Sequence, residues 1–130
     1  MRLAHWEENL NAVVVTALER RFRWGTHDCA SFAFGCVLAL TGRDLYREYV
    51  GRYKTQATAD EVLRSIGGFT DFTSSHFETV DVGAALVGDL GLAKSGTLCV
   101  CAAPGRWIAP SARALATTFS EEIVRAWRVA

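Results

Sequence analysis

The spacing of apolar residues changes from helical to strand-like partway along the chain, and this change constrains the fold more than any other feature. Up to residue 66, apolar residues recur every three or four positions, which is typical of helix faces. After residue 80 they form short runs separated by glycine-containing turns, which is typical of strands. Helices followed by antiparallel strands predict an α+β domain, and no repeat or linker divides residues 1–130.

The first and third predicted helices have recognisable ends. An apolar stripe runs through residues 6–23, and Gly25 supplies the left-handed conformation that ends many helices. The third helix is expected over residues 58–66. Thr58 would be its N-cap, and Glu61 stands three residues later, as a capping box requires.

The second predicted helix covers residues 28–40. Thr26 or Asp28 would cap its N-terminus with a side-chain oxygen, and Gly42 would stop it. Cys29 would then lie in its first turn.

Three strand-like runs lie at residues 87–93, 96–103 and 106–111. Short turns separate them, so we expect an antiparallel meander of three or more strands. Residues 119–129 predict a short helix, capped by Ser120, that runs into a last strand.

The charge balance gives this chain no preferred class of partner. Fourteen basic side chains balance fourteen acidic ones, so no long-range field attracts nucleic acid or an anionic membrane. The apolar run near the N-terminus is far shorter than the ~20 residues that cross a bilayer, and we expect neither a signal peptide nor a membrane span. Residues 43–54 mix basic, acidic and tyrosine side chains and are interpreted as an exposed connection.

The four cysteines are expected to be free thiols, because no secretion signal precedes them. Cys36, Cys99 and Cys101 are interpreted as small buried side chains. Their spacing does not fit the paired ligands of a usual zinc site, so no metal or other cofactor is expected. Alternation along a strand still places Cys99 and Cys101 on one face, and a metal site that they share with Cys29 or Cys36 remains a weaker alternative.

Cys29 is the residue whose predicted position suggests chemistry. Unpaired backbone N–H groups and the positive end of the helix dipole stabilise a thiolate at a helix N-terminus, which can lower a cysteine pKa from ~8.5 to between ~3.5 and 7.5. The same N–H groups can bind the oxyanion that forms when a thiolate attacks a carbonyl. Asp28 opposes this effect unless its carboxylate points away as a cap.

The residues around Cys29 resemble a known family. The segment "DCASF" at residues 28–32 is similar to the Asp-Cys-Ser-Gly-Phe motif that opens the catalytic helix of NlpC/P60 cysteine peptidases, and Gly-Asp-Leu at 88–90 resembles the start of that family's first central strand. A short branch of this family, encoded beside tail genes of phages and gene transfer agents, looks similar over "FRWGTHDCASFAFGCVLALTGRDL", "GRYKT", "GDLGLA" and "AWRV".

This resemblance implies a papain-like fold that cuts the peptide stems of peptidoglycan, with Cys29 as nucleophile at the start of a central helix. The family's histidine base stands at the start of the strand after the Gly-Asp-Leu strand. Thr97 or Leu98 occupies that place here, and neither accepts a proton near neutral pH. The third polar group would fall near residues 107–109, which offer no suitable side chain.

Two other histidines are candidate bases. His27 is close to Cys29 in sequence, although we favour a local hydrogen bond to the turn as its role. His76 lies in a polar stretch that would have to fold over the site, and a solvated loop position is favoured. Asp28 and Asp89 are assigned supporting roles.

Two functions remain open from the sequence. The first is a tail-associated NlpC/P60-like peptidase or amidase with slow or no hydrolysis, whose substrate would be peptidoglycan stem peptides. The second is an inactive tail-tip or tail-assembly protein with the same fold, which binds neighbouring tail proteins. Both place the protein in the virion tail, after assembly in the host cytoplasm.

Overall fold

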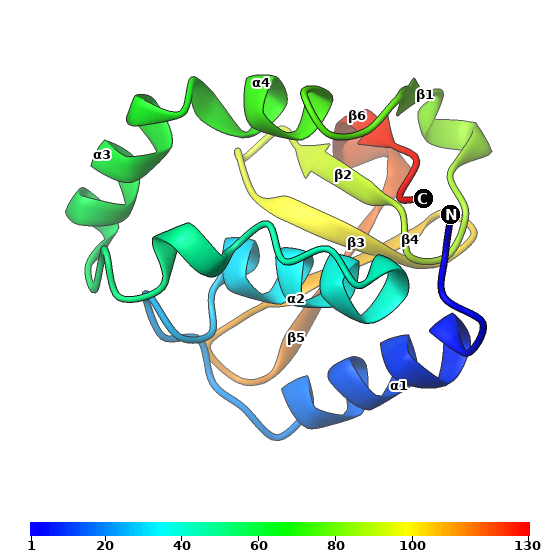
Figure 1. The fold of residues 1–130 in the computed structure, drawn as a ribbon, viewed down its shortest axis with the longest axis horizontal. Coiled ribbons are helices and arrows are strands. Elements are labelled where there is room, and N and C mark those ends of the chain that lie inside the picture. The colour runs from blue at the N-terminus through cyan, green and yellow to red at the C-terminus, as the bar shows by residue number, and fades with distance from the viewer.

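The computed structural model describes residues 1–130 as four helices followed by a six-stranded antiparallel sheet, which confirms the α+β class (Figure 1). The helices are α1 (Trp6–Ala17), α2 (Cys29–Thr41), α3 (Gln56–Ser65) and α4 (Gly68–Ser74). The strands are β1 (Thr79–Val80), β2 (Leu90–Ala93), β3 (Leu98–Ala103), β4 (Arg106–Pro110), β5 (Leu115–Phe119) and β6 (Ile123–Trp127). None of the helices has the length and apolar character needed to cross a membrane.

Local side-chain chemistry sets both ends of α2. The Asp28 carboxylate accepts the Ser31 N–H at 2.9 Å, and the Ser31 hydroxyl accepts the Asp28 N–H at 2.9 Å, which forms a capping box. Gly42 ends the helix with a φ of 79°. The predicted helix is therefore confirmed to within one residue, with Asp28 rather than Thr26 as its cap.

Helix α1 is shorter than its apolar pattern predicts. It ends at Ala17, six residues before the expected position, and the chain then turns toward the sheet. The Phe22 N–H donates to the Ser111 carbonyl at 3.0 Å, a contact between segments far apart in the sequence. This long-range bond holds residues 18–23 outside the helix, so Gly25 does not end α1.

The predicted cap of α3 was wrong by three residues. Thr55, not Thr58, caps the helix, and its hydroxyl accepts the Thr58 N–H at 3.2 Å. Gly67, with a φ of 83°, occupies the N-cap position of α4, a helix that the sequence did not predict. Gly67 and Gly68 therefore lie where α3 gives way to a further helix.

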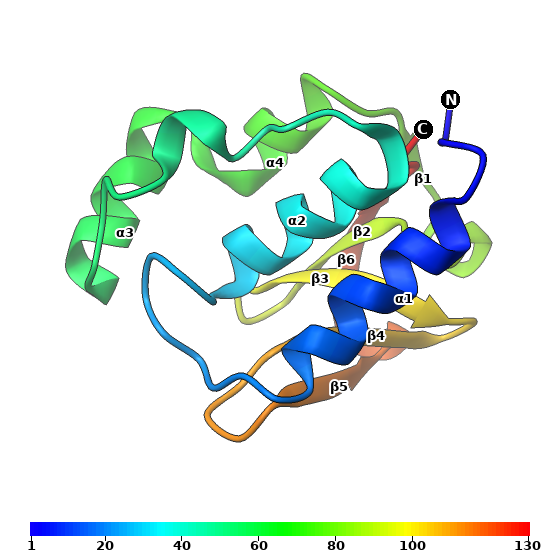
Figure 2. The same ribbon diagram turned by 60° about the horizontal axis from the view of Figure 1, so that its bottom comes forward.

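Helices α1 and α2 cover one face of the sheet (Figure 2). The strand order is β1-β6-β2-β3-β4-β5, and every neighbouring pair is antiparallel. The predicted meander is therefore present as β2, β3 and β4. Leu98 and Val100 of β3 face α2 in the main core cluster, where Leu40 and Val37 also lie.

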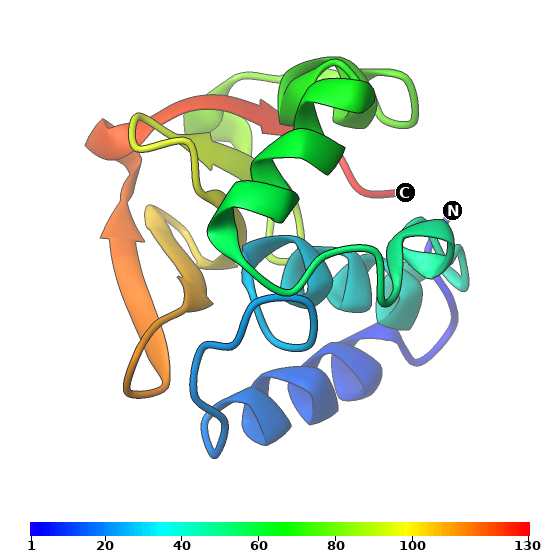
Figure 3. The same ribbon diagram turned by 90° about the vertical axis from the view of Figure 1, so that its left-hand side faces the viewer.

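The opposite face of the sheet encloses a second, smaller core. The short turn Ser120–Glu122 links edge strand β5 to β6, which pairs with β2, so the sheet curls (Figure 3). Trp107 lies inside the curl, and its Nε1 donates to the Ser120 hydroxyl at 3.2 Å. The prediction that Ser120 caps a helix is therefore wrong, because its hydroxyl instead accepts the Trp107 N–H. Gly91 has no side chain because a Cβ there would lie 2.6 Å from the Trp107 ring.

Candidate active site

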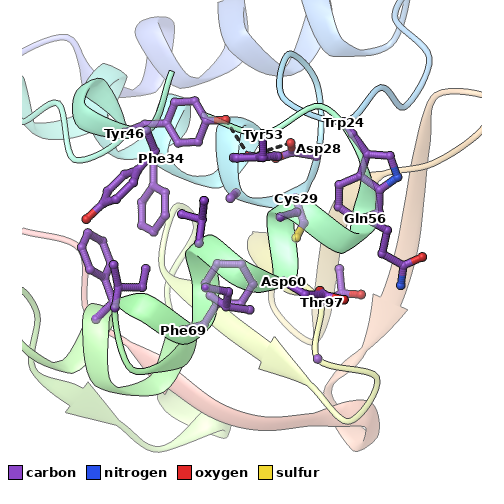
Figure 4. Close-up of a pocket in the computed structure, with 18 of the residues that line it drawn as sticks. Trp24, Asp28, Cys29, Phe34, Tyr46, Tyr53, Gln56, Asp60, Phe69 and Thr97 are labelled. Atoms are coloured by element: carbon purple, nitrogen blue, oxygen red, sulfur yellow. Dashed lines mark hydrogen bonds between the residues drawn. The ribbon is translucent and has the colours of Figure 1, made fainter. Parts of the chain in front are cut away.

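Cys29 is the first residue of α2 and opens into a cavity of about 240 Å³, which we call the Cys29 cavity. Helices α3 and α4 and the turn between β2 and β3 form its other sides (Figure 4). Thr97, just before β3, lines the cavity together with Cys29. The remaining walls are mainly aromatic and aliphatic, and include Trp24, Phe34, Tyr46, Tyr49, Phe69 and Phe72. The predicted position of Cys29, in the first turn of the second helix, is confirmed.

The thiol of Cys29 is not activated in this structure. Burial among apolar side chains raises its pKa to about 11, although the backbone amides of Leu98, Ala30 and Cys29 itself favour the thiolate. The charge of Asp28 raises the pKa further. The expectation of a lowered pKa is therefore wrong, because loss of solvation outweighs the stabilising effect of the helix end.

Asp28 points away from the sulfur and serves as a structural cap. Its side chain is buried and accepts the N–H groups of Gly25 and Ser31, each at 2.9 Å, and the Tyr53 hydroxyl at 2.7 Å. These three donors stabilise the ionised carboxylate inside the protein. Its supporting role is therefore to hold the start of α2.

Two tyrosines that the sequence analysis placed in an exposed connection belong to the site. The Tyr53 hydroxyl donates to Asp28, so it accepts the hydrogen of Tyr46 across a 2.6 Å contact (Figure 4). Tyr53 is only 6% exposed, and burial raises the pKa of both phenols. Nothing in residues 43–54 signals this burial locally, because the contact partner lies at the start of α2.

His27 does not face the Cys29 cavity. It is 3% exposed and lines a separate groove between α1 and α2. Its backbone pairs with Arg23, but its side chain makes no hydrogen bond to the turn, contrary to our expectation. The structure therefore does not bring His27 to Cys29 as a base.

His76 lies at the opposite end of α2 from Cys29. Its Nδ1 contacts the Arg43 guanidinium at 3.1 Å, and Arg43 directly follows the C-terminal cap of that helix. The thirteen residues of α2, at about 1.5 Å of rise each, separate the two ends by roughly 20 Å. His76 is half-buried against Phe72 and Phe77, so it is neither a base for Cys29 nor a freely solvated loop residue.

Asp89 is also far from Cys29, because it precedes the end of β2 that lies away from the β2–β3 turn. Its buried carboxylate pairs with Arg2 at 3.2 Å and Arg128 at 2.9 Å. It also accepts the backbone N–H groups of Leu86 and Val129. The role of Asp89 is therefore to join the two ends of the chain, which lie side by side (Figure 1).

The cysteines do not form a metal site. All four are free, and Cys36, Cys99 and Cys101 are fully buried as predicted. Cys99 and Cys101 lie in the core inside the curled sheet, whereas Cys36 lies on the helix side and Cys29 packs against that side. No three His, Cys, Asp or Glu side chains are grouped to hold a metal ion.

The Cys29 cavity contains no histidine, lysine or arginine. Its carboxylates are Asp28, which is fully hydrogen-bonded, and Asp60, an exposed residue of α3 at the rim. Because no histidine lines the cavity, the Cys29 thiol, whose pKa is about 11, has no neighbour suited to take its proton. The cavity can bind an apolar group beside a neutral thiol, but it lacks an efficient proton acceptor.

Comparison with known proteins gives a family and no function. A family model described as "Domain of unknown function (DUF6950)" matches residues 1–129. No curated protein and no solved structure matches the chain.

Proposed function

We propose that this chain, which belongs to the DUF6950 family, is a non-hydrolysing NlpC/P60-like component of a phage or gene-transfer-agent tail, where it binds neighbouring tail proteins. The observation that carries this proposal is the Cys29 cavity, in which a cysteine at a helix mouth faces Thr97 and no base. The resemblance of residues 28–32 and 88–90 to the peptidase motifs supports the NlpC/P60 likeness. The longer match to the short tail-associated branch, from "FRWGTHDCASFAFGCVLALTGRDL" to "AWRV", supports the tail context.

The arrangement around α2 supports a papain-like ancestry. The helix packs on β3, and the backbone of Leu98, the first residue of β3, approaches the sulfur closely enough to affect its pKa. In the peptidases that the sequence resembles, the base stands at this strand start. By this resemblance Thr97 or Leu98 would occupy the base position, and a mainly apolar cavity adjoins the thiol.

The protonation state of Cys29 supports loss of hydrolysis. With a pKa of about 11, Cys29 is almost entirely the neutral thiol at pH 7. The missing general acid also matters, because such a group commonly contributes ~10² to 10⁴ in rate. Together these effects leave little nucleophilic attack and no efficient departure of the amine.

One observation favours the alternative, a slow peptidase or amidase that opens peptidoglycan. The backbone amides of Cys29, Ala30 and Leu98 are close enough to the sulfur to favour its thiolate, and such groups can stabilise an oxyanion. A histidine from a neighbouring tail protein would have to complete this site. This enzyme would be active in assembled tails and inactive as a purified chain.

Digestion of purified peptidoglycan separates the two functions. The wild type, Cys29→Ala and purified tails would each be incubated with peptidoglycan, and released stem-peptide fragments measured by mass spectrometry. We expect wild type and Cys29→Ala to release equal amounts, in tails as well as alone, and we expect the chain to be a stoichiometric tail component. Cys29-dependent release, or absence of the chain from tails, would overturn the proposal.

A variant that restores a base tests the assignment of Thr97. Thr97→His places an imidazole beside the thiol, and a histidine that takes up the thiol proton favours the thiolate and lowers the cysteine pKa. Thr97→Gln has a similar size without the basic ring and serves as the control. An unchanged Cys29 pKa in Thr97→His would show that position 97 is not equivalent to the base position of the peptidases.

A further inference from the structure

A second cavity lies outside the Cys29 site, between the C-terminal half of α1 and the first half of α2. This α1–α2 groove has a volume of about 350 Å³. Its polar lining comes from Thr16, Arg20, Thr26, His27 and Ser31, and Gly35 and apolar side chains complete it. No acidic side chain lines the groove.

His27 lines this groove and carries a hydrogen-bonding atom that has no partner within the chain. The residue is 3% exposed, and its Nε2 atom is buried without any hydrogen-bond partner. Leaving a buried polar atom unpaired commonly costs about 1–3 kcal/mol. Burial and the nearby Arg20 lower the His27 pKa, which favours the neutral ring, and a neutral imidazole carries one N–H donor.

Gly35 is the second feature without an explanation inside the chain. It lies within α2, where glycine costs about 1 kcal/mol relative to alanine. Its φ is not positive, and a Cβ at this position would meet no atom within 4 Å. Neither backbone conformation nor packing therefore requires glycine, whereas a methyl group would reduce the space in the groove.

The charge of the groove favours an anion. Arg20 is its only charged lining residue, and one of its five N–H groups donates to the Thr26 carbonyl at 3.2 Å. The remaining donors are free for a ligand. Asp28 is close enough to raise the pKa of His27, but three donors on its other side already satisfy its carboxylate.

We propose that the α1–α2 groove is a binding site for a carboxylate carried on an apolar stem. Arg20 and the His27 ring hold the carboxylate, and the space beside Gly35 takes the stem against Ala12 and Val13. This site is separate from the Cys29 cavity and goes beyond the proposed tail function. The same chemistry occurs in a free fatty or branched-chain acid and at the C-terminus of a peptide.

Titration followed by NMR of the His27 ring protons tests the site. The probes are 4-methylpentanoate and its neutral analogue 4-methylpentanamide, together with acetyl-Ala-Ala-Leu bearing either a free or an amidated C-terminus. We expect each carboxylate to bind at least about tenfold more tightly than its amide, a difference of about 1.4 kcal/mol. The tighter of the two carboxylates identifies the source, a free acid or a peptide terminus.

Matched variants locate the binding. Arg20→Gln should weaken carboxylate binding at least about tenfold, whereas Arg21→Gln, which changes an exposed neighbour outside the groove, should not. Gly35→Ala should also weaken binding while it stabilises the free protein. Gly83→Ala is the control, because Gly83 likewise has open space at its Cβ position but lies outside the groove.

Three outcomes would overturn the proposal that the α1–α2 groove binds a carboxylate. The first is equal binding of carboxylates and amides, and the second is binding that Arg20→Gln and Gly35→Ala leave unchanged. The third is an absence of saturation below about 10 mM for every probe.

Discussion

The two ends of the β2–β3 hairpin contrast in how their polar groups are satisfied. At one end, Asp89 is buried with two arginines and two backbone N–H groups around its carboxylate. At the other end, the thiol of Cys29 lies in an apolar cavity without a basic side chain. Both oxygens of the Asp89 carboxylate are therefore paired within the chain, as in a structural ion-pair cluster. The thiol of Cys29, in contrast, has no side chain nearby that is suited to accept its proton.

The contrast shows why a buried polar residue in a motif does not by itself indicate chemistry. Asp28 and Asp89 both occur in segments that resemble a peptidase, and both are fully satisfied by donors within the chain. Satisfied carboxylates of this kind stabilise the fold. A group that transfers a proton in a reaction must instead be within hydrogen-bond reach of the substrate and have a pKa suited to the transfer.

Removal of the Asp89 charge should have the largest effect on stability. Asp89→Asn leaves Arg2 and Arg128 without their shared partner, and breaking a buried ion pair commonly costs about 3–5 kcal/mol. Urea unfolding followed by circular dichroism measures this loss. Asp81→Asn, at an exposed position with no side-chain partner, is the control and should change stability by less than about 0.5 kcal/mol. Equal losses of stability in the two variants would show that the ion pairs of Asp89 do not stabilise the fold.

Loss of the Tyr53 hydroxyl should have a smaller effect at the cavity end. Tyr53→Phe removes a 2.7 Å hydrogen bond to the Asp28 carboxylate, and bonds to charged groups contribute about 1.5–3 kcal/mol. The Cys29 thiol should keep its raised pKa, because apolar burial remains. Tyr49→Phe is the matched control, since that hydroxyl has no partner in the structure. A loss no larger than that of the control would mean that the tyrosine chain does not hold the start of α2.

The third effect is a dependence of stability on pH. Burial lowers the folded-state pKa of both His27 and His76 below the ordinary value of 6.5. The unfolded chain therefore binds more protons just below pH 7, so stability falls as the pH decreases through 6.5 and levels off below the folded-state pKa. Each histidine contributes at most about 1.4 kcal/mol per pH unit.

Unfolding curves between pH 7.5 and 5 for His27→Gln and His76→Gln test this dependence. Each substitution should remove part of the slope, and the double variant should remove more than either one. A double variant with the slope of the wild type would show that these two rings do not cause the pH dependence.

The elements that local chemistry determines were predictable from the sequence. Asp28 caps the start of α2 and Gly42 caps its end, and both act through contacts with residues close to them in sequence. The helix and the position of Cys29 were therefore predicted correctly. The end of α1 and the burial of Tyr53 were not predictable, because both depend on partners about twenty-five to ninety residues away. The direction of His27 depends on tertiary packing in the same way, and its closeness to Cys29 in sequence was misleading.

The protonation state of Cys29 decides whether the cavity holds a neutral thiol or an activated nucleophile. Selective ¹³Cβ labelling of cysteine, with Cys29→Ser to assign the signal, allows the thiol to be titrated in the folded protein by NMR. We predict a chemical-shift change centred near pH 11, because the loss of solvation around Cys29 disfavours its thiolate. A transition below about pH 8 would contradict it, because a thiolate present at neutral pH would make Cys29 an activated nucleophile.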